Sequence, residues 1–222
     1  MRKVVDLTLP IVSNHWRYSN TYAPVRRIVD GEASNATRYE LQSHMFTHID
    51  APRHILADGK VLEEFPLDLL VGKAAILDVS DVAPNQGIDA DMLRKAYERC
   101  EPSSILLVKT SWGLQRDWMT TEFWDDAPYI TDSGAEYLMS LNPKVVGYDF
   151  PQDYDLRRLR HVPEHECDLT THRYILINEV LMIEYMTNLW QVPKRNVDFV
   201  GLPLYVTNAD GAQIRCVAVF DE

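Results

Sequence analysis

Short runs of apolar and β-branched residues, separated by turn-forming residues, recur along the whole chain. Runs of this length and composition are typical of β-strands. They predict strands over residues 3–8, 26–29, 38–42, 73–79, 104–109, 145–148, 181–185, 198–203 and 213–220. The pattern therefore indicates a β-rich protein.

Two segments show the spacing of an amphipathic helix instead. In residues 89–100, Asp89 is placed to cap the N-terminus and apolar side chains recur at the helical period. In residues 131–140, Thr131 is the expected cap. The chain has no internal repeat, low-complexity tract or linker, and 222 residues commonly form one domain. We therefore expect a mixed α/β, β-rich fold in a single domain over residues 1–222.

Charge and hydropathy narrow the possible partners. A formal net charge of −11 disfavours nucleic acid and anionic membranes, because those partners are bound by clustered Lys and Arg. No stretch approaches the roughly 18 to 20 apolar residues of a membrane span, and the N-terminus lacks the pattern of a signal peptide. We therefore expect a cytoplasmic protein that acts on a small molecule and keeps its cysteines reduced.

The densest group of chemically active side chains consists of three histidines and one aspartate, namely His44, His48, Asp50 and His54. Imidazole nitrogens and carboxylate oxygens are ligands that suit zinc, manganese and iron. In a strand, His48 and Asp50 share one face about 7 Å apart. His44 would lie about 13 Å from His48, so the chain must turn or bulge within residues 45–47 for His44 to reach the same ion. Pro52 argues against a helix through this segment.

Other interpretations of the chemically active residues remain open. The histidines could be unrelated surface or core side chains. A second concentration of ligand types could form a structural zinc site; it comprises His161, Glu164, His165, Glu166, Cys167 and Asp168. Cys167 could also be a nucleophile paired with His165 or His172. No G-x-S-x-G, P-loop or G-x-G-x-x-G motif is present, so serine hydrolases, NTPases and dinucleotide enzymes lose their usual sequence support.

The array H-x-x-T-H-x-D-x-P-x-H closely resembles the H-x-G-T-H-x-D-x-P-x-H motif of a family of metal-dependent hydrolases. That family includes bacterial kynurenine formamidase, isatin hydrolase and proteins labelled as cyclases. Further similarity lies in Asp6-Leu7-Thr8, in residues 105–113 (ILLVKTSWG), in residues 146–149 (VGYD) and in residues 202–219, which contain Asp210, Gly211 and Arg215. The resemblance implies the swivelling β/β/α fold of this family.

The resemblance also completes the site. It implies that His172 and Glu184 join His44, His48 and Asp50 as ligands, so that each chain holds one or two divalent ions, with zinc as first choice and manganese or iron as alternatives. A bound ion lowers the pKa of water from about 15.7 toward 7. His54 would then carry a proton to the departing nitrogen, and Glu184 could bridge to a second ion or act as a base.

Phe46 is a departure from the family motif, because it replaces a glycine at the bend that His44 needs. Glycine tolerates backbone angles that phenylalanine does not. Either the backbone is ordinary here, or an aromatic ring has been added to the pocket wall. Phe46, Trp16 and Trp112 are accordingly candidates for a wall that accepts a flat substrate.

The function implied by the resemblance is metal-dependent hydrolysis of an amide C–N bond. The substrate would be an N-formyl arylamine such as N-formylkynurenine, as in tryptophan catabolism, or an isatin-like cyclic amide. Alternatives are a metal-dependent lyase or cyclase that stabilises an enolate, and a non-catalytic binding protein braced by a metal. The resemblance further implies a homodimer or larger oligomer, consistent with the aromatic segment His15-Trp16-Arg17-Tyr18 and with Tyr22.

Overall fold

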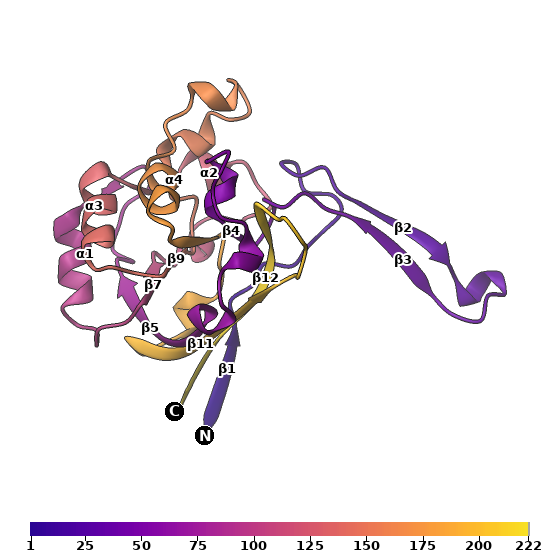
Figure 1. Ribbon diagram of the computed structural model, residues 1–222, viewed down its shortest axis with the longest axis horizontal. Helices are drawn as coiled ribbons and strands as arrows, with labels where there is room; N and C mark the ends of the chain where they lie inside the picture. Colours follow the sequence, from indigo (N-terminus) through magenta and orange to yellow (C-terminus); the bar gives the residue numbers. More distant parts are fainter. Residues whose placement is uncertain (222) are drawn as a thin grey trace.

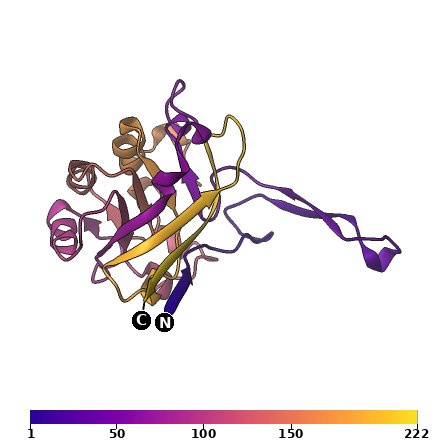
Figure 2. The same ribbon diagram turned by 60° about the horizontal axis from the view of Figure 1, so that its bottom comes forward.

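The computed structural model describes residues 1–221 and is built around one eight-stranded sheet (Figures 1 and 2). Across the sheet the strands run β1 (Arg2–Asp6), β12 (Gly211–Asp221), β11 (Asn196–Pro203), β5 (Val71–Asp78), β7 (Ile105–Lys109), β9 (Val145–Tyr148), β10 (Leu181–Glu184) and β4 (His48–Asp50). Strand β4 pairs with both β10 and β12, so the sheet closes into a barrel-like ring. Strand β1 pairs with the distal part of β12.

The direction of the strands follows from their connections. Strands β5, β7, β9 and β10 are parallel neighbours, whereas β1, β4, β11 and β12 pair antiparallel. Parallel strands need crossover connections, which here contain α1 (Ala90–Tyr97), α2 (Glu122–Asp125), α3 (Asp132–Ser140) and α4 (Thr170–Ile175). The helices gather against one side of the sheet (Figure 1).

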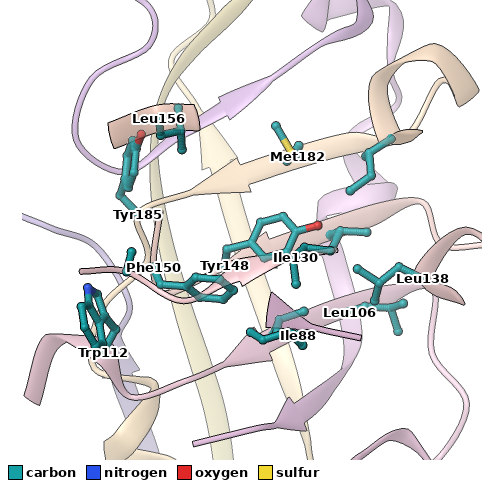
Figure 3. Close-up of a cluster of buried hydrophobic side chains, with 14 of the residues drawn as sticks. Ile88, Leu106, Trp112, Ile130, Leu138, Tyr148, Phe150, Leu156, Met182 and Tyr185 are labelled. Atoms are coloured by element: carbon teal, nitrogen blue, oxygen red, sulfur yellow. The ribbon is translucent and has the colours of Figure 1, made fainter. Parts of the chain in front are cut away.

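The sheet separates two apolar cores. Along β7, Ile105 and Leu107 point into the interior of the ring, and Leu106 and Val108 point to the outer core beneath the helices. Figure 3 shows the outer core around Leu106. Because both faces of this strand are buried, its sequence is a continuous apolar run rather than an alternating one.

Smaller elements complete the fold. A two-stranded sheet pairs β6 (Gly87–Ile88) with β8 (Tyr129–Ile130). Short 3-10 turns are η1 (Ile28–Asp30), η2 (Pro52–His54), η3 (Leu62–Glu64), η4 (Leu67–Leu70), η5 (Trp112–Leu114), η6 (Tyr154–Arg157), η7 (Glu164–Glu166), η8 (Leu176–Asn178) and η9 (Leu189–Gln191).

None of the helices within residues 1–221 is long and apolar enough to cross a membrane.

A hairpin projects from the body of the molecule as an arm (Figures 1 and 2). It consists of β2 (Thr21–Arg26) and β3 (Ala36–Glu40), with η1 at its tip. Apart from the partly buried Ala36, the residues of these two strands are exposed. We refer to residues 21–40 as the arm.

The prediction of a mixed, β-rich α/β fold is confirmed. Both predicted helices are present with the expected caps, since the side chains of Asp89 and Thr131 accept hydrogen bonds from Met92 N and Gly134 N. The prediction of a strand over 26–29 is wrong, because β2 ends at Arg26 and a 3-10 turn follows. Helix α4 was not predicted, because its few residues lead directly into a long apolar segment that hides the helical period.

Candidate metal centre

Strand β4 delivers the first two site residues. His48 and Asp50 point to the outer face of the ring, and Ile49 between them points to its interior. On the neighbouring strand, Glu184 is the register partner of His48, so its side chain lies on the same face. His48 Nε2 lies 3.2 Å from Asp50 Oδ1 and 3.3 Å from Glu184 Oε2. Two adjacent strands therefore bring three polar side chains together inside a buried region.

A left-handed bend at Phe46 brings His44 to the same place. The φ angle of Phe46 is 54°, a conformation that favours glycine and costs other residues about 1–2 kcal/mol. Of the two alternatives for Phe46, an ordinary backbone is therefore wrong: the bend is kept although the glycine is not. Thr47 holds the bend, because its Oγ1 donates to Tyr185 O and accepts from Leu9 N.

Strand β12 supports His44 from the other side. Gln213 Nε2 donates to the carbonyls of Gln42 and Ser43, at 2.6 and 3.1 Å, and so fixes the chain just before His44. Gly211 faces the imidazole directly, since a Cβ at this position would lie 2.7 Å from His44 Cε1. A side chain at 211 would displace His44 from the site.

His44 lies between two carboxylates. Its Nδ1 is 2.7 Å from Asp50 Oδ1, and its Nε2 is 3.2 Å from Asp210 Oδ2. Its ring stacks on that of His54, with the ring centroids 3.7 Å apart. His54 ends the 3-10 turn that starts at Pro52, so the proline bend returns this histidine toward the strand that precedes it.

Helix α4 adds His172 from the opposite side of the site. Asp153 fixes this residue, because its carboxylate accepts from Thr171 N and Thr171 Oγ1 and lies 2.7 Å from His172 Nδ1. His172 Nε2 is left facing Asp50 Oδ2 at 3.7 Å and Glu184 Oε1 at 3.5 Å. In metal-binding histidines, one ring nitrogen usually donates to a carboxylate or carbonyl, and this hydrogen bond orients the other nitrogen toward the metal. Asp153 gives His172 this support.

The carboxylates of the site attract positive charge. Burial lowers the pKa of His44, but its contacts with Asp50 and Asp210 outweigh burial and raise that pKa to about 9. Burial likewise lowers the pKa of His172, while its hydrogen bond to Asp153 and the surrounding carboxylates raise it to about 9. The surrounding carboxylates therefore favour the positively charged form of both imidazoles.

The pKa values of His54 and Asp50 are shifted by burial and by the same neighbouring side chains. Burial lowers the pKa of His54 to about 4; Asp50 opposes this shift, and the nearby imidazoles add to it. Burial raises the pKa of Asp50, but its interactions with His48 and His44 hold that pKa well below its usual range. Asp50 therefore stays ionised at the centre of the site.

The side chains present fit a divalent cation. The ligand atoms of His44, His48 and Asp50 lie within 4.8 Å of one another, as do those of Asp50, His54 and His172. His48 Nδ1 donates to the Phe46 carbonyl at 2.8 Å, which leaves the lone pair of Nε2 directed at two carboxylates. His48 Nε2 and Asp50 Oδ2 are also buried without a hydrogen-bond partner among residues 1–221. Electron-rich atoms that converge in this way are stabilised by a cation.

Asp50 is common to both groups, so the site can hold one or two ions. A third converging group, made of His44, His54 and Asp210, lies toward the surface. Glu184 lies beside the first two groups, but no such group among residues 1–221 includes it. Instead, the Gln152 amide donates to Glu184 Oε1 and orients the carboxylate.

The metal-site residues line a cavity of about 510 Å³, a volume that suits a small molecule. The predicted wall residues differ in their positions. Trp16 lines the cavity and is 37% exposed. Phe46 does not line it; its ring is buried 4.8 Å from that of Tyr18. The prediction for Trp112 is wrong, because this residue is buried in the outer core and its Nε1 donates to Phe123 O.

The competing interpretations of residues 161–168 find no support in the geometry. Within the described part of the chain, no converging group of ligand atoms includes His161, His165 or Cys167. Cys167 is also a poor nucleophile, because the pKa of its thiol is raised. Partial burial is the larger cause, and the charges of nearby acidic residues add to it.

Several site residues were missed by sequence reasoning. Gln152 and Asp153 orient Glu184 and His172, and Arg17 and Tyr185 line the cavity. A signal did exist for the first two, since polar residues just beyond a fully buried parallel strand often face a site. Arg17 and Tyr185 carry no spacing that distinguishes them from surface or core residues.

Comparison with known proteins finds sequence similarity to bacterial kynurenine formamidases. It is similar to the kynurenine formamidase of Salinibacter ruber, at 29% identity over 195 residues, covering 86% of this chain and 83% of the relative. The kynurenine formamidase of Bacillus mycoides is 28% identical over 183 residues, covering 82% of this chain and 79% of the relative.

Solved structures agree in fold. A structure described as a potential metal-dependent hydrolase with cyclase activity has a TM-score of 0.74 and 25% identity, with 100% of each chain covered. Isatin hydrolase A from Labrenzia aggregata has a TM-score of 0.78 and 19% identity, covering 100% of this chain and 94% of the other, and shares the fold.

A family model described as "Putative cyclase" matches residues 5–152, which include the His44 to His54 array. His172 and Glu184 lie beyond the matched range, and the fold brings them back to the array. The predicted family is therefore confirmed, and the chain belongs to this cyclase family.

Proposed function

We propose that this protein hydrolyses the C–N bond of a small aromatic amide with the help of a divalent metal ion, zinc being the first candidate. The substrate is an N-formyl arylamine such as N-formylkynurenine, or a cyclic amide of the isatin type. The observation that carries the proposal is the buried convergence of His44, His48 and Asp50, with two ligand atoms unpartnered, beside a cavity of about 510 Å³. The relatives named above support the choice of reaction.

The ligands of the ion divide into two groups that share one carboxylate. His44, His48 and Asp50 would hold a first ion, and Asp50, His54 and His172 a second one. When bound, a divalent ion supplies a lowered pKa for water and polarisation of the substrate carbonyl.

The protein's own residues would handle the protons. Glu184 is held by Gln152, and its Oε2 faces the site 3.3 Å from His48 Nε2, so it is placed to accept the proton of an attacking water. When only the first ion is bound, His54 stands free at the cavity wall, where its imidazole can take up the proton released through Glu184 and pass it to the departing nitrogen. An amide nitrogen leaves poorly without that proton, so both roles are needed in one turnover.

A metal-reconstituted activity screen tests this proposal. Protein stripped with a chelator is loaded with zinc, manganese or iron and assayed on formanilide, N-formylkynurenine, isatin and a hydroxy acid, with metal content measured on the same preparation. We expect metal-dependent hydrolysis of at least one amide. Dehydration of the hydroxy acid without amide hydrolysis would indicate a lyase, and full metal content with no turnover would indicate a binding protein.

We further propose that the protein is a homodimer in which the arm packs on a second copy. An isolated two-stranded hairpin is marginally stable in water, yet this arm exposes Tyr22, Val25, Ile28, Val29 and Tyr39, with Val29 84% exposed. Only part of the aromatic segment adds to this exposed surface, because His15 and Tyr18 are buried within their own chain, whereas Trp16 and Tyr22 are each 37% exposed.

Light scattering tests the assembly. The particle should have twice the 25.6 kDa mass of the chain, and Ile28→Asp with Val29→Asp should shift it to the monomer. Val206→Asp is the matched control, since Val206 is an exposed apolar residue outside the arm. A wild-type protein that remains at 25.6 kDa at micromolar concentration would contradict the dimer.

A further inference from the structure

Arg17 places a positive charge in the wall of the substrate cavity. It lies in the irregular segment between β1 and the arm, and it lines the same cavity as His44, His54 and Glu184. Its guanidinium carbon lies 5.4 Å from the centroid of the buried Trp124 ring. The aromatic face limits where the side chain can go and leaves its charge available to the cavity.

Arg17 differs from the other arginine of the cavity in its partners. Arg160 forms an ion pair with Asp125 at 2.5 Å, so its charge is balanced within the protein. Arg17 forms no ion pair with a carboxylate anywhere in residues 1–221, although it is partly buried. A fully buried arginine is almost always paired, because removing its charge from water is costly, and partial burial brings part of the same cost. An unpaired one beside a catalytic cavity is suited to an anion that arrives with the ligand.

We propose that Arg17 recognises a carboxylate on the substrate, and so selects anionic aromatic amides over neutral ones. This inference rests on the proposed amide hydrolysis and adds the chemical class of the substrate. The amide group would lie at the metal-site residues. The flat ring would lie beside Trp16 and the apolar side chains of Leu159 and Leu169, which line the same cavity.

A different role for Arg17 would be to balance the charge of Glu184. Burial raises the pKa of the Tyr18 hydroxyl; Arg17 opposes that shift and Glu184 adds to it, so both charges act on one neighbourhood. A balancing role would affect neutral and anionic substrates equally, because Glu184 takes part in the turnover of both. A recognition role would affect the anionic substrate alone.

The test compares wild type and Arg17→Gln on formanilide and on its carboxylate-bearing derivatives, meta- and para-formamidobenzoate. The loss of one charge-assisted pair should raise KM for the better carboxylate substrate about 10- to 100-fold, with kcat and the constants for formanilide little changed. Arg17→Lys should restore part of the loss. Arg160→Gln removes the same formal charge from the same cavity, but should leave the preference between the two substrates within about threefold of wild type, since that charge is already paired.

Binding provides a readout that does not depend on turnover. Quenching of tryptophan fluorescence by para-formamidobenzoate should weaken in Arg17→Gln by the same factor as KM rises. An Arg17→Gln defect of equal size on formanilide, or no defect on either substrate, would overturn the recognition role even if wild type is active. Arg17-dependent binding without any hydrolysis by wild type would instead overturn the proposed reaction and leave the recognition role standing.

Discussion

The two faces of strands β4 and β10 differ sharply although they share one backbone. Ile49 and Ile183 point into the closed ring and are fully buried among other apolar side chains. The alternate residues His48, Asp50 and Glu184 point outward and are buried as well, but they are charged or polar. The inner face gains about 1.5–3 kcal/mol for each large apolar side chain, whereas buried carboxylates without full compensation cost several kcal/mol. Burial of the apolar inner face therefore offsets the free-energy cost of burying charged groups on the outer face.

The largest effect is expected from removing the central charge of the outer face. Asp50→Asn keeps the shape of the side chain but removes the carboxylate that both ligand groups share, so the chain should lose its bound metal and about a thousandfold or more in kcat/KM. Elemental analysis and kinetics on one preparation measure both. Asp210→Asn is the matched control, because Asp210 belongs only to the surface group that it forms with His44 and His54. This variant should lose far less metal and far less activity. Full metal content in Asp50→Asn would refute the assignment.

A large loss of a different kind is expected from the inner face. Ile183→Ala should lower the free energy of unfolding by about 2–5 kcal/mol, and Ile183→Val by about 0.5–1.5 kcal/mol, because each leaves a cavity inside the packed ring. Metal content per folded chain should not change. Urea unfolding with elemental analysis checks this, and metal loss in Ile183→Val would show that the two faces are not independent.

A variant of His54 separates two roles within the metal site, since this residue is both a potential ligand and a potential proton carrier. His54→Ala should keep the ion at His44, His48 and Asp50 while turnover of amides falls about a hundredfold. An activated ester should suffer less, because its leaving group needs little proton assistance. Loss of one of two ions would assign His54 as a ligand, and unchanged amide turnover would exclude the proton-carrying role.

The smallest effect is expected as a difference between two variants at Phe46, the bend that precedes β4. At Phe46, glycine should be more stable than alanine by about 1 kcal/mol, the reverse of the usual order, because the φ angle of 54° is strained for any side chain. Both variants should be less stable than wild type, which buries the aromatic ring. Urea unfolding of Phe46→Gly and Phe46→Ala measures the difference, and a more stable alanine variant would mean that the bend relaxes in solution.

Much of the fold could be predicted from the sequence, because its signals are local. Strands such as β7 and β9 are short apolar runs between turn signals, and the caps Asp89 and Thr131 precede regular helical spacing. The arm was only partly predicted, since its strands carry little apolar pattern and bury almost nothing. Helix α4 was missed because it is short and runs into apolar residues that read as a strand.

The ligand types and their local order can be read from the sequence alone, because His48 and Asp50 share a face of any strand that contains them. The sequence also required a turn before His48, and the structure has that turn at Phe46. Which other side chains converge on His48 and Asp50 depends on contacts between distant parts of the chain. Residues far apart in the chain, such as His172, Glu184 and Arg17, meet His48 because pairing between β4 and β10 and the packing of α4 and the N-terminal segment are long-range. No spacing along the chain encodes those distances, since they depend on how a closed sheet brings separate strands side by side.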